Sequence, residues 1–476
     1  MKTNQFVLIF LLALLTLTGN APLWGQDASL TSNKITASFF NDGDRWCVLG
    51  DSITHAGSYH KDVELFYLTR YPVKKLDVVN CGIAGDNAEG ALKRIGWDCM
   101  SNKPTVVSLM LGMNDVKGGL YASNPDPTIM EKRKAANAAY ETNMTSLWAK
   151  IVGGGAKLIL ITPSPYDDTA SESQTLKFAS NHPGQSEALR GYAERVKELA
   201  TTLGVPVVDF NTPMSAITAT HQKTNSSFTL IGKDRVHPGP VGHLVMAYEF
   251  LKSQGVDGTV SSIDVDASSG RVLGSSNCNI SDIKTGGDGV TFQCLEKSLP
   301  YPLTKEQQPA LEMIPFTQDL NMETLRIAGL PKGNYLLTID GRKIRDYSAA
   351  QLDQGVNLAL ETNTPQAMQS AEVLAALSKK WVSADKIRTI VFNEFYALPV
   401  AARPLTNAAY VSQKYGEKLS ASKSTNPYFS TIREHYTEYK PQEAEIQRQI
   451  QDAVTMARRL AIPREHTFSV TKVPSP

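Results

Sequence analysis

The chain has 476 residues, 42% of them hydrophobic, and its 48 Lys and Arg residues nearly balance 47 Asp and Glu residues. This length predicts two or more domains with real hydrophobic cores. No Lys/Arg run is long enough to form a nucleic-acid or membrane patch, so the charge pattern argues against both kinds of partner.

The first residues differ in composition from the rest of the chain. Lys2 precedes the apolar run FVLIFLLALLTL at residues 6–17, and small and polar residues follow. This order is typical of a secretory signal peptide, and the run is too short for a comfortable membrane span. We therefore predict a signal peptide over residues 1–26 and a secreted or periplasmic protein with no stable membrane span after its removal.

Short apolar runs then alternate with stretches of helical period as far as residue 255. Continuous apolar runs are typical of strands buried on both faces of a parallel sheet. Between them, apolar residues recur at helical spacing, and Gly153 and Gly204 stand where two of these helices should end. The alternation predicts a three-layer α/β/α sandwich with a five-stranded parallel sheet, placed at residues 36–258. The predicted strands lie within residues 46–50, 76–83, 105–112, 157–163 and 205–210.

The composition changes after Gly255. We predict a β-rich accessory module over residues 262–360, in which two runs around residues 331–334 are interpreted as a hairpin. A mainly helical region is expected over residues 361–476, and the terminal VTKVPSP is expected to fray.

The five cysteines give little evidence for a metal site. Cys47 and Cys81 lie in apolar runs and are predicted to be buried. Cys278 and Cys294 flank a glycine-rich turn, and export would permit a disulfide between them, although spacing alone leaves the pairing open. No Cys/His cluster has zinc spacing, so we expect neither a metal nor a cofactor.

Polar residues gather where the predicted strands end. In an open parallel sheet, ligands bind beyond the carboxyl ends of the strands. The first strand ends at Ser52, the second is followed by Gly85 and the third by Asn114, while Asp234 and His237 follow the fifth. These segments should meet at one edge of the sheet.

Three of these residues have the chemistry of nucleophilic catalysis. A serine hydroxyl is a weak nucleophile unless a base takes its proton, and His237 is our candidate base for Ser52. Asp234, three residues earlier, is the candidate for orienting the imidazole. Pro238 keeps His237 out of helical geometry, and the helix expected from Pro240 should hold the loop in place.

The same edge offers donors for an oxyanion. The backbone N–H of Ser52 lies at a helix start, where amide protons are free. The N–H of Gly85 is not shielded by a side chain, and the side-chain amide of Asn114 can donate directly. We predict that these three groups form an oxyanion hole.

Four short blocks, in this order, resemble those of the SGNH hydrolases, also called the GDSL esterase/lipase family. They are GDSIT, NCGIAGD, GMND and DRVH, within a likeness that covers about residues 44–255. Ile53 replaces the leucine that usually follows the serine. The resemblance, which is to bacterial exported members, implies a flavodoxin-like fold, a Ser52–His237–Asp234 triad, and Gly85 and Asn114 as oxyanion donors.

We therefore expect an exported serine esterase that forms an acyl-enzyme, with O-acetyl or other short acyl esters of carbohydrates as its leading substrates. A lipase, lysophospholipase-type or general acyl esterase of the same family is an alternative. The β-rich module motivates a third possibility, a non-catalytic glycan-binding protein.

Other polar residues near the blocks are assigned structural roles. His55 and His60 are ranked below His237 as the base, and Asp51 and Asp115 are interpreted as hydrogen-bond acceptors that brace their turns. A two-metal phosphoesterase would need several carboxylate and imidazole ligands. It is disfavoured because Asp115 stands where that class requires a histidine.

Overall fold

The computed structural model describes residues 39–121, 125–172, 176–397, 408–422 and 427–474. The predicted signal peptide at residues 1–26 lies outside them. Within the described ranges, no helix has both the length and the apolar character needed to cross a bilayer.

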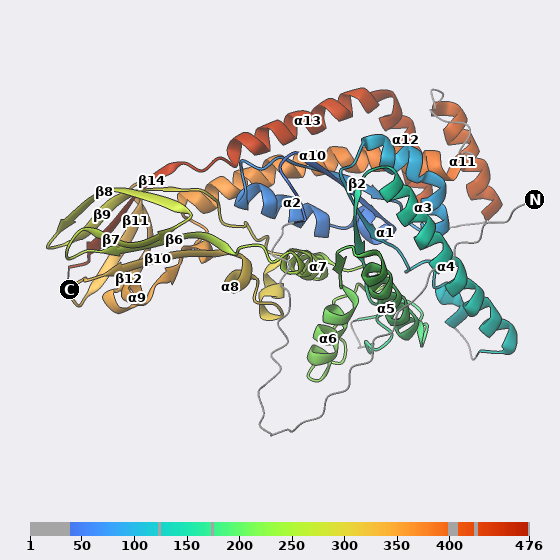
Figure 1. The fold of residues 1–476 in the computed structure, drawn as a ribbon, viewed down its shortest axis with the longest axis horizontal. Helices are drawn as coiled ribbons and strands as arrows, with labels where there is room; N and C mark the ends of the chain where they lie inside the picture. Colours follow the sequence, from blue (N-terminus) through green and yellow to red (C-terminus); the bar gives the residue numbers. More distant parts are fainter. Residues whose placement is uncertain (1–38, 122–124, 173–175, 398–407, 423–426, 475–476) are drawn as a thin grey trace, which may run out of the picture. The chain divides into compact units, whose positions relative to one another are not determined.

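A five-stranded parallel sheet with the order β2-β1-β3-β4-β5 forms the centre of the α/β part. Its edge strand β2 is labelled in Figure 1. β1 and β3 are buried almost throughout, because their side chains meet packed neighbours on both faces of the sheet. The predicted five-stranded parallel α/β fold is therefore confirmed. The strands are β1 (Asp44–Gly50), β2 (Leu76–Gly82), β3 (Val106–Met110), β4 (Lys157–Ile161) and β5 (Val207–Val208).

Helices connect these strands and begin and end largely where the sequence predicts. One helix ends at Gly153, and another is followed by Gly204, whose φ of 62° is the left-handed conformation of a glycine C-cap. A third begins at Pro240. α2 packs against α7, and α3 against α4. The helices are α1 (Ser52–Ala56), α2 (Tyr59–Arg70), α3 (Ala88–Arg94), α4 (Pro127–Gly153), α5 (Gln185–Leu203), α6 (Asn211–Gln222) and α7 (Pro240–Ser253).

Two further sheets enclose a second hydrophobic core. One has the order β13-β10-β6-β7 and the other the order β12-β11-β14-β9-β8. Their strands are β6 (Thr259–Asp266), β7 (Arg271–Ser276), β8 (Cys278–Gly286), β9 (Gly289–Glu296), β10 (Met322–Ala328), β11 (Asn334–Ile339), β12 (Arg342–Ser348), β13 (Val356–Asn357) and β14 (Glu465–Lys472). Two short helices, α8 (Phe316–Leu320) and α9 (Ala349–Gln354), accompany them.

The hairpin predicted around residues 331–334 is wrong. The strands on either side of that segment, β10 and β11, belong to different sheets, so the segment is a crossover between the sheets. The hairpin lies one turn later, where β11 pairs with β12 through Asp340 and Gly341. Both residues have positive φ, 52° and 76°, as a type I′ turn requires. Asp-Gly is the stronger hairpin signal, and Pro331 cannot donate to a strand ladder.

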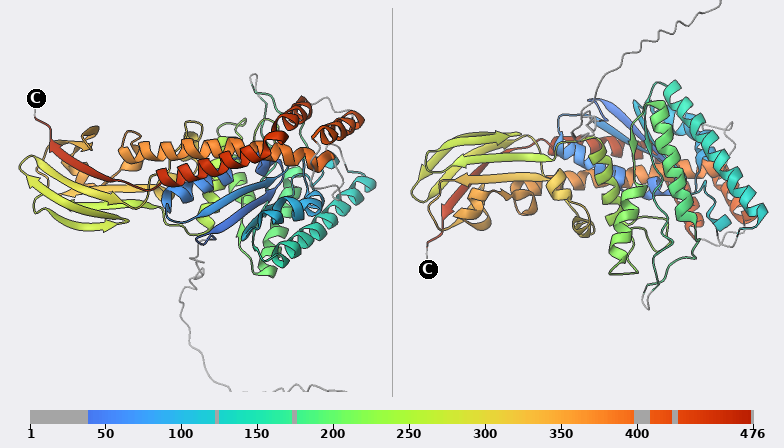
Figure 2. Two further views of the ribbon diagram at one scale, coloured as in Figure 1. Left: turned by 90° about the horizontal axis from the view of Figure 1, so that it is seen from above. Right: turned by 60° about the horizontal axis from the view of Figure 1, so that its bottom comes forward.

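Four helices lead away from the β-rich part and back to it (Figure 2). They are α10 (Pro365–Ala397), α11 (Ala408–Ser422), α12 (Pro427–Tyr439) and α13 (Glu443–Leu460). α10 and α13 run side by side and also approach the α/β part, since α10 contacts α1, α2 and β2. After α13 the chain enters β14, which pairs with β9 and β11.

The expected fraying of the terminal segment is wrong for its first three residues. Val470 is buried and Thr471 and Lys472 lie in β14, because inward-facing His466, Phe468 and Val470 alternate along this strand.

Candidate active site

Ser52 lies at the abrupt junction between β1 and α1. It is the first residue of the helix, and Asp51 caps the helix by accepting the N–H of Ile53 at 3.0 Å. A Cβ at Gly50 would collide with the side chain of Thr54, so the sharp exit from the strand requires glycine. Burial raises the pKa of Asp51 to about 7, while the bond from Ile53, which braces the turn, opposes that shift.

The structure brings Ser52, His237 and Asp234 together in one hydrogen-bonded chain. Ser52 Oγ lies 2.7 Å from Nε2 of His237, and Nδ1 of the same ring lies 2.5 Å from Oδ2 of Asp234. Because a carboxylate only accepts hydrogen bonds, Nδ1 must carry a proton, and in the neutral ring Nε2 is then free to accept the serine proton. The side chains of His237 and Asp234 are about half exposed, 46% and 50%, so these hydrogen-bonded side chains face solvent.

The loop before α7 holds this geometry. Asp234 Oδ1 accepts the N–H groups of Val236 and His237, at 3.0 and 2.9 Å. Although partial burial opposes the effect, these bonds and the bond to the imidazole lower the pKa of Asp234 to about 2. The bond to Asp234 in turn raises the pKa of His237 against the effect of burial. Arg235, between them, anchors the loop by donating to the carbonyls of residues 167, 170 and 179.

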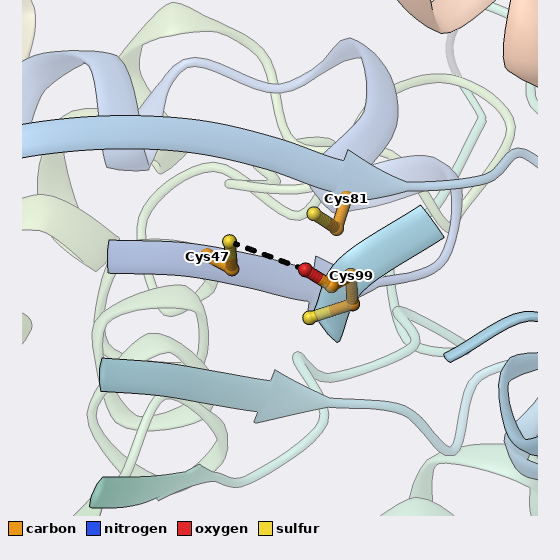
Figure 3. A group of neighbouring side chains, drawn as sticks. All are labelled: Cys47, Cys81 and Cys99. Carbon is orange, nitrogen blue, oxygen red and sulfur yellow. Dashed lines mark hydrogen bonds between the residues drawn. The ribbon is translucent and has the colours of Figure 1, made fainter. Parts of the chain in front are cut away.

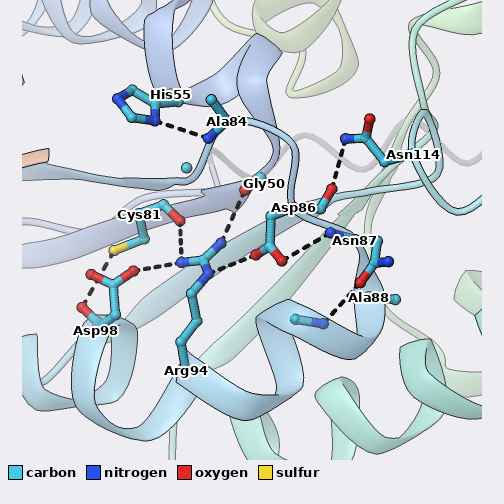
Figure 4. Close-up of polar contacts among 12 residues, drawn as sticks. Gly50, His55, Cys81, Ala84, Asp86, Asn87, Ala88, Arg94, Asp98 and Asn114 are labelled. Carbon is cyan, nitrogen blue, oxygen red and sulfur yellow. Dashed lines mark hydrogen bonds and ion pairs between the residues drawn. The ribbon is translucent and has the colours of Figure 1, made fainter. Parts of the chain in front are cut away.

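The structure shows what surrounds each of the three predicted oxyanion donors. Asn114 donates one N–H of its amide to the carbonyl of Asp86 at 2.7 Å, which fixes the amide and leaves a second N–H (Figure 4). Gly85 has a left-handed φ of 76°. Among the described residues, the backbone N–H groups of Ser52 and Gly85 have no hydrogen-bond acceptor. Groups of this kind can receive a negatively charged oxygen.

A buried arginine ties this edge of the sheet together and was not identified from the sequence. Arg94 donates to the carbonyls at the ends of β1 and β2, Gly50 O at 3.0 Å and Cys81 O at 2.7 Å (Figure 4). It also pairs with Asp86 at 2.7 Å and Asp98 at 2.5 Å. No local motif marks Arg94, because its partners other than Asp98 come from separate strands and loops.

The residues that were assigned structural roles make no hydrogen bond with Ser52. His55 Nδ1 accepts the N–H of Ala84 at 3.0 Å, and burial, helped by Arg388, lowers its pKa to about 3, so the ring is neutral. The ring of His60 bonds to the carbonyl of Thr54. Asp115 accepts the N–H of Ala88.

Two cavities lie close to these segments. One, of about 440 Å³, adjoins the hydrogen-bonded chain and has Asn114 and Asp234 in its wall, together with Tyr166, His182 and Gln185. A larger one, of about 1060 Å³, lies between β2 and the helices α10 and α13, and its lining does not include Ser52 or His237.

The cysteines are all free thiols in the structure, so Cys278 and Cys294 form no disulfide. Cys47 and Cys81 are buried as predicted, and with Cys99 they form a cluster whose sulfur atoms lie within 4.8 Å of one another (Figure 3). All three are completely buried in the hydrophobic core. We interpret the cluster as packing, because the Cys47 and Cys81 thiols face backbone carbonyls.

An open parallel sheet whose carboxyl edge carries this hydrogen-bonded chain and these free donors is the arrangement of the SGNH hydrolases, α/β enzymes that cleave ester bonds. Residues 48–245 match the model of the GDSL-like lipase/acylhydrolase family. Residues 48–245 are therefore a GDSL-like lipase/acylhydrolase domain, and the protein is an ester-bond hydrolase.

Known proteins agree with this identification. The acetylxylan esterase of Geobacillus stearothermophilus is 25% identical over 230 residues, which are 45% of this chain and 95% of that protein. A human protein, isoamyl acetate-hydrolyzing esterase 1 homolog, is 28% identical over 213 residues, 44% of this chain and 78% of the relative. The solved structure of a gut microbial diltiazem-metabolizing enzyme is similar over 92% of this chain and 99% of its own, with 29% identity and a TM-score of 0.83.

Proposed function

We propose that the chain is an exported serine esterase that removes short acyl groups, with O-acetylated carbohydrates as its leading substrates. The observation that carries the proposal is the 2.7 Å contact between Ser52 Oγ and His237 Nε2, with Asp234 on the other ring nitrogen. His237 takes the serine proton while Oγ attacks the ester carbonyl. The oxyanion of the tetrahedral intermediate is then received by the N–H groups of Ser52, Gly85 and Asn114.

The second half of the reaction uses the same groups. Protonated His237 gives its proton to the leaving alcohol, which departs and leaves Ser52 acylated. Water, deprotonated by His237, then attacks the acyl-enzyme and releases the carboxylic acid, which restores the serine hydroxyl. These residues account for every proton moved, so the proposal needs no cofactor.

Two observations support short acyl groups on a sugar. Both curated relatives are named for acetate esters, and one of those esters is on a polysaccharide. The wall of the cavity beside Asn114 and Asp234 includes the polar side chains of Tyr166, His182 and Gln185, together with apolar Met113 and Val236. Hydroxyl, imidazole and amide groups suit an alcohol that carries hydroxyls of its own better than an aliphatic chain. Export is supported by the sequence pattern of residues 1–26.

A panel of esters tests the proposal. Wild type and Ser52→Ala should be compared on aryl acetate, butyrate and decanoate esters and on acetylated xylan. We expect the highest kcat/KM on acetates, release of acetate from the polysaccharide, and loss of at least 1000-fold in Ser52→Ala. A preference for decanoate would favour a lipase, and polysaccharide binding without turnover would favour a glycan-binding protein. Either result, or full turnover by Ser52→Ala, would overturn the proposal.

A further inference from the structure

The peptide that carries the Gly85 N–H is held by a helix far away in the sequence. The hydroxyl of Tyr396, on α10, donates to the carbonyl oxygen of Ala84 at 2.8 Å. That carbonyl and the N–H of Gly85 belong to the same peptide unit. In a planar trans peptide, the C=O and N–H bonds point in opposite directions. A donor fixed on the carbonyl therefore directs the N–H away from Tyr396.

We propose that Tyr396 is a positioning residue that orients and polarises the Gly85 N–H as an oxyanion donor. The inference rests on the proposed function, since it assigns Tyr396 a part in the same site. A hydrogen bond to a carbonyl withdraws charge through the peptide and makes its N–H a stronger donor. Tyr396 acts through the peptide and does not itself reach the reacting carbon.

The neighbouring peptides are held as well. The N–H of Ala84 donates to His55 Nδ1 at 3.0 Å, and Arg388 of α10 donates to the carbonyl of Gly82 from Nε and Nη2, at 3.2 and 2.9 Å. The loop is therefore bonded at three successive points, two of them by α10. With those bonds in place, the Ala84–Gly85 peptide has little freedom to flip.

Packing places Tyr396 where this role requires it. Ile83 is completely buried in a cluster whose other buried members come from the C-terminal helices, among them Ile390, Phe392 and Val411. The ring centroids of Phe392 and Tyr396 lie 4.7 Å apart, and this packing restricts the orientation of the Tyr396 ring. A Cβ at Gly85 would lie 3.2 Å from the Tyr396 hydroxyl, so the tyrosine closes the space beside the glycine.

This inference gives the C-terminal half a part in the chemistry. The curated relatives cover only 44–45% of the chain. Their matched segments are shorter than the α/β part together with α10, so the brace from α10 is a property of the longer architecture. The solved structure that covers 92% of the chain shares that greater length.

Tyr396→Phe tests the inference, with Tyr335→Phe as the matched control. Tyr335 also donates its hydroxyl to a backbone carbonyl at 2.8 Å, that of Pro331, but it lies in the core of the β-rich part. Each variant loses a hydroxyl and its hydrogen bond to a backbone carbonyl, so their stability losses should be similar. The measurements are melting temperature, kcat and KM on an aryl acetate, and the Ki of phenylboronic acid, which forms a tetrahedral adduct with a serine hydroxyl.

Loss of an entire oxyanion donor costs about 100- to 1000-fold, so a weakened donor should cost about tenfold. For Tyr396→Phe we expect kcat about tenfold lower, KM within about twofold of wild type, and Ki raised by the same factor as kcat is lowered. Tyr335→Phe should match wild type in kcat, KM and Ki. A folded Tyr396→Phe with wild-type kcat, or with lower kcat but unchanged Ki, would overturn the inference.

Ser52→Ala separates this result from failure of the proposed function. Full turnover by Ser52→Ala would contradict the proposed function itself. An inactive Ser52→Ala beside a fully active Tyr396→Phe would leave the esterase proposal intact and overturn only the role of Tyr396.

Discussion

At the scale of single residues, hydrogen bonds to the backbone hold the polar side chains of the site in one orientation. Asn114 is held by the carbonyl of Asp86, and Asp234 by the two backbone N–H groups that follow it. Both side chains are therefore oriented before substrate arrives, so little reorganisation is needed during the reaction.

Asn114→Ala should remove one oxyanion donor without disturbing the fold. We expect kcat to be about 100- to 1000-fold lower, with KM and melting temperature close to wild type. Steady-state kinetics on an aryl acetate and a thermal melt check this. Asn225→Ala, at an exposed position, is the control and should behave as wild type. Near-normal kcat in Asn114→Ala would contradict the assignment.

Asp234→Asn should change the pH profile as well as the rate. The general base must be neutral, so kcat/KM should rise with pH through the pKa of His237, which Asp234 holds above its usual value of about 6.5. Removing the carboxylate should move this acidic limb to lower pH, while the maximal rate falls by roughly 10⁴-fold because the wrong tautomer is favoured. A pH–rate profile that superimposes on that of wild type, after scaling, would contradict the role of Asp234.

The five candidate site residues could be selected from the sequence because each lies in a recognisable motif at the end of a strand or in a loop. Arg94, Arg388 and Tyr396 could not. Each of them donates to a backbone carbonyl in another segment, that of Gly50, Gly82 or Ala84, and no local pattern encodes such a pairing.

At the scale of elements, local patterns predicted the buried strands well and the pairing of the β-rich strands poorly. Parallel strands buried on both faces have continuous apolar sequences, which are distinctive. The half-exposed strands β10 and β11 both alternate, and alternation does not say which sheet a strand joins. The residues of the turn indicate which consecutive strands form a hairpin. Here Asp340-Gly341, both with positive φ, indicates that β11 pairs with β12.

Two strands, one from each sheet of the β-rich part, carry a buried acid pair whose contribution to stability depends on pH. Glu296 of β9 and Glu323 of β10 are almost completely buried, 2% and 0% exposed. Burial and the neighbouring Glu296 carboxyl raise the pKa of Glu323 well above its usual value. The stability that this group contributes is therefore complete below about pH 4.3, the pKa of the unfolded chain. It is lost as the pH rises toward the pKa of the folded protein, by about 1.4 kcal/mol for each pH unit between the two values.

Glu323→Gln should flatten that dependence. Between pH 5 and 8 we expect the melting temperature of wild type to fall more steeply than that of Glu323→Gln, with the difference largest at pH 8. Calorimetry at several pH values checks this, and Glu312→Gln, at an exposed residue, should follow wild type. Parallel curves for wild type and Glu323→Gln would contradict the account.

At the scale of the whole described chain, the segments interleave. α10 leaves the β-rich part and contacts α1 and β2, and α13 returns the chain so that β14 can pair with β9 and β11. β14 and β9 are about 170 residues apart in the sequence, and no local pattern reveals a partner at that distance. The sequence therefore predicts the α/β part as a unit but not how the C-terminal region supports it.

The central claim is that Ser52 is acylated during turnover. Wild type and Ser52→Ala should be mixed with an aryl acetate, quenched in acid within milliseconds, and digested for mass spectrometry. The account predicts one acetyl group, on the peptide containing Ser52, and none in Ser52→Ala, which should also lose turnover. An acetyl group on a different residue, or hydrolysis by Ser52→Ala at the wild-type rate, would contradict it.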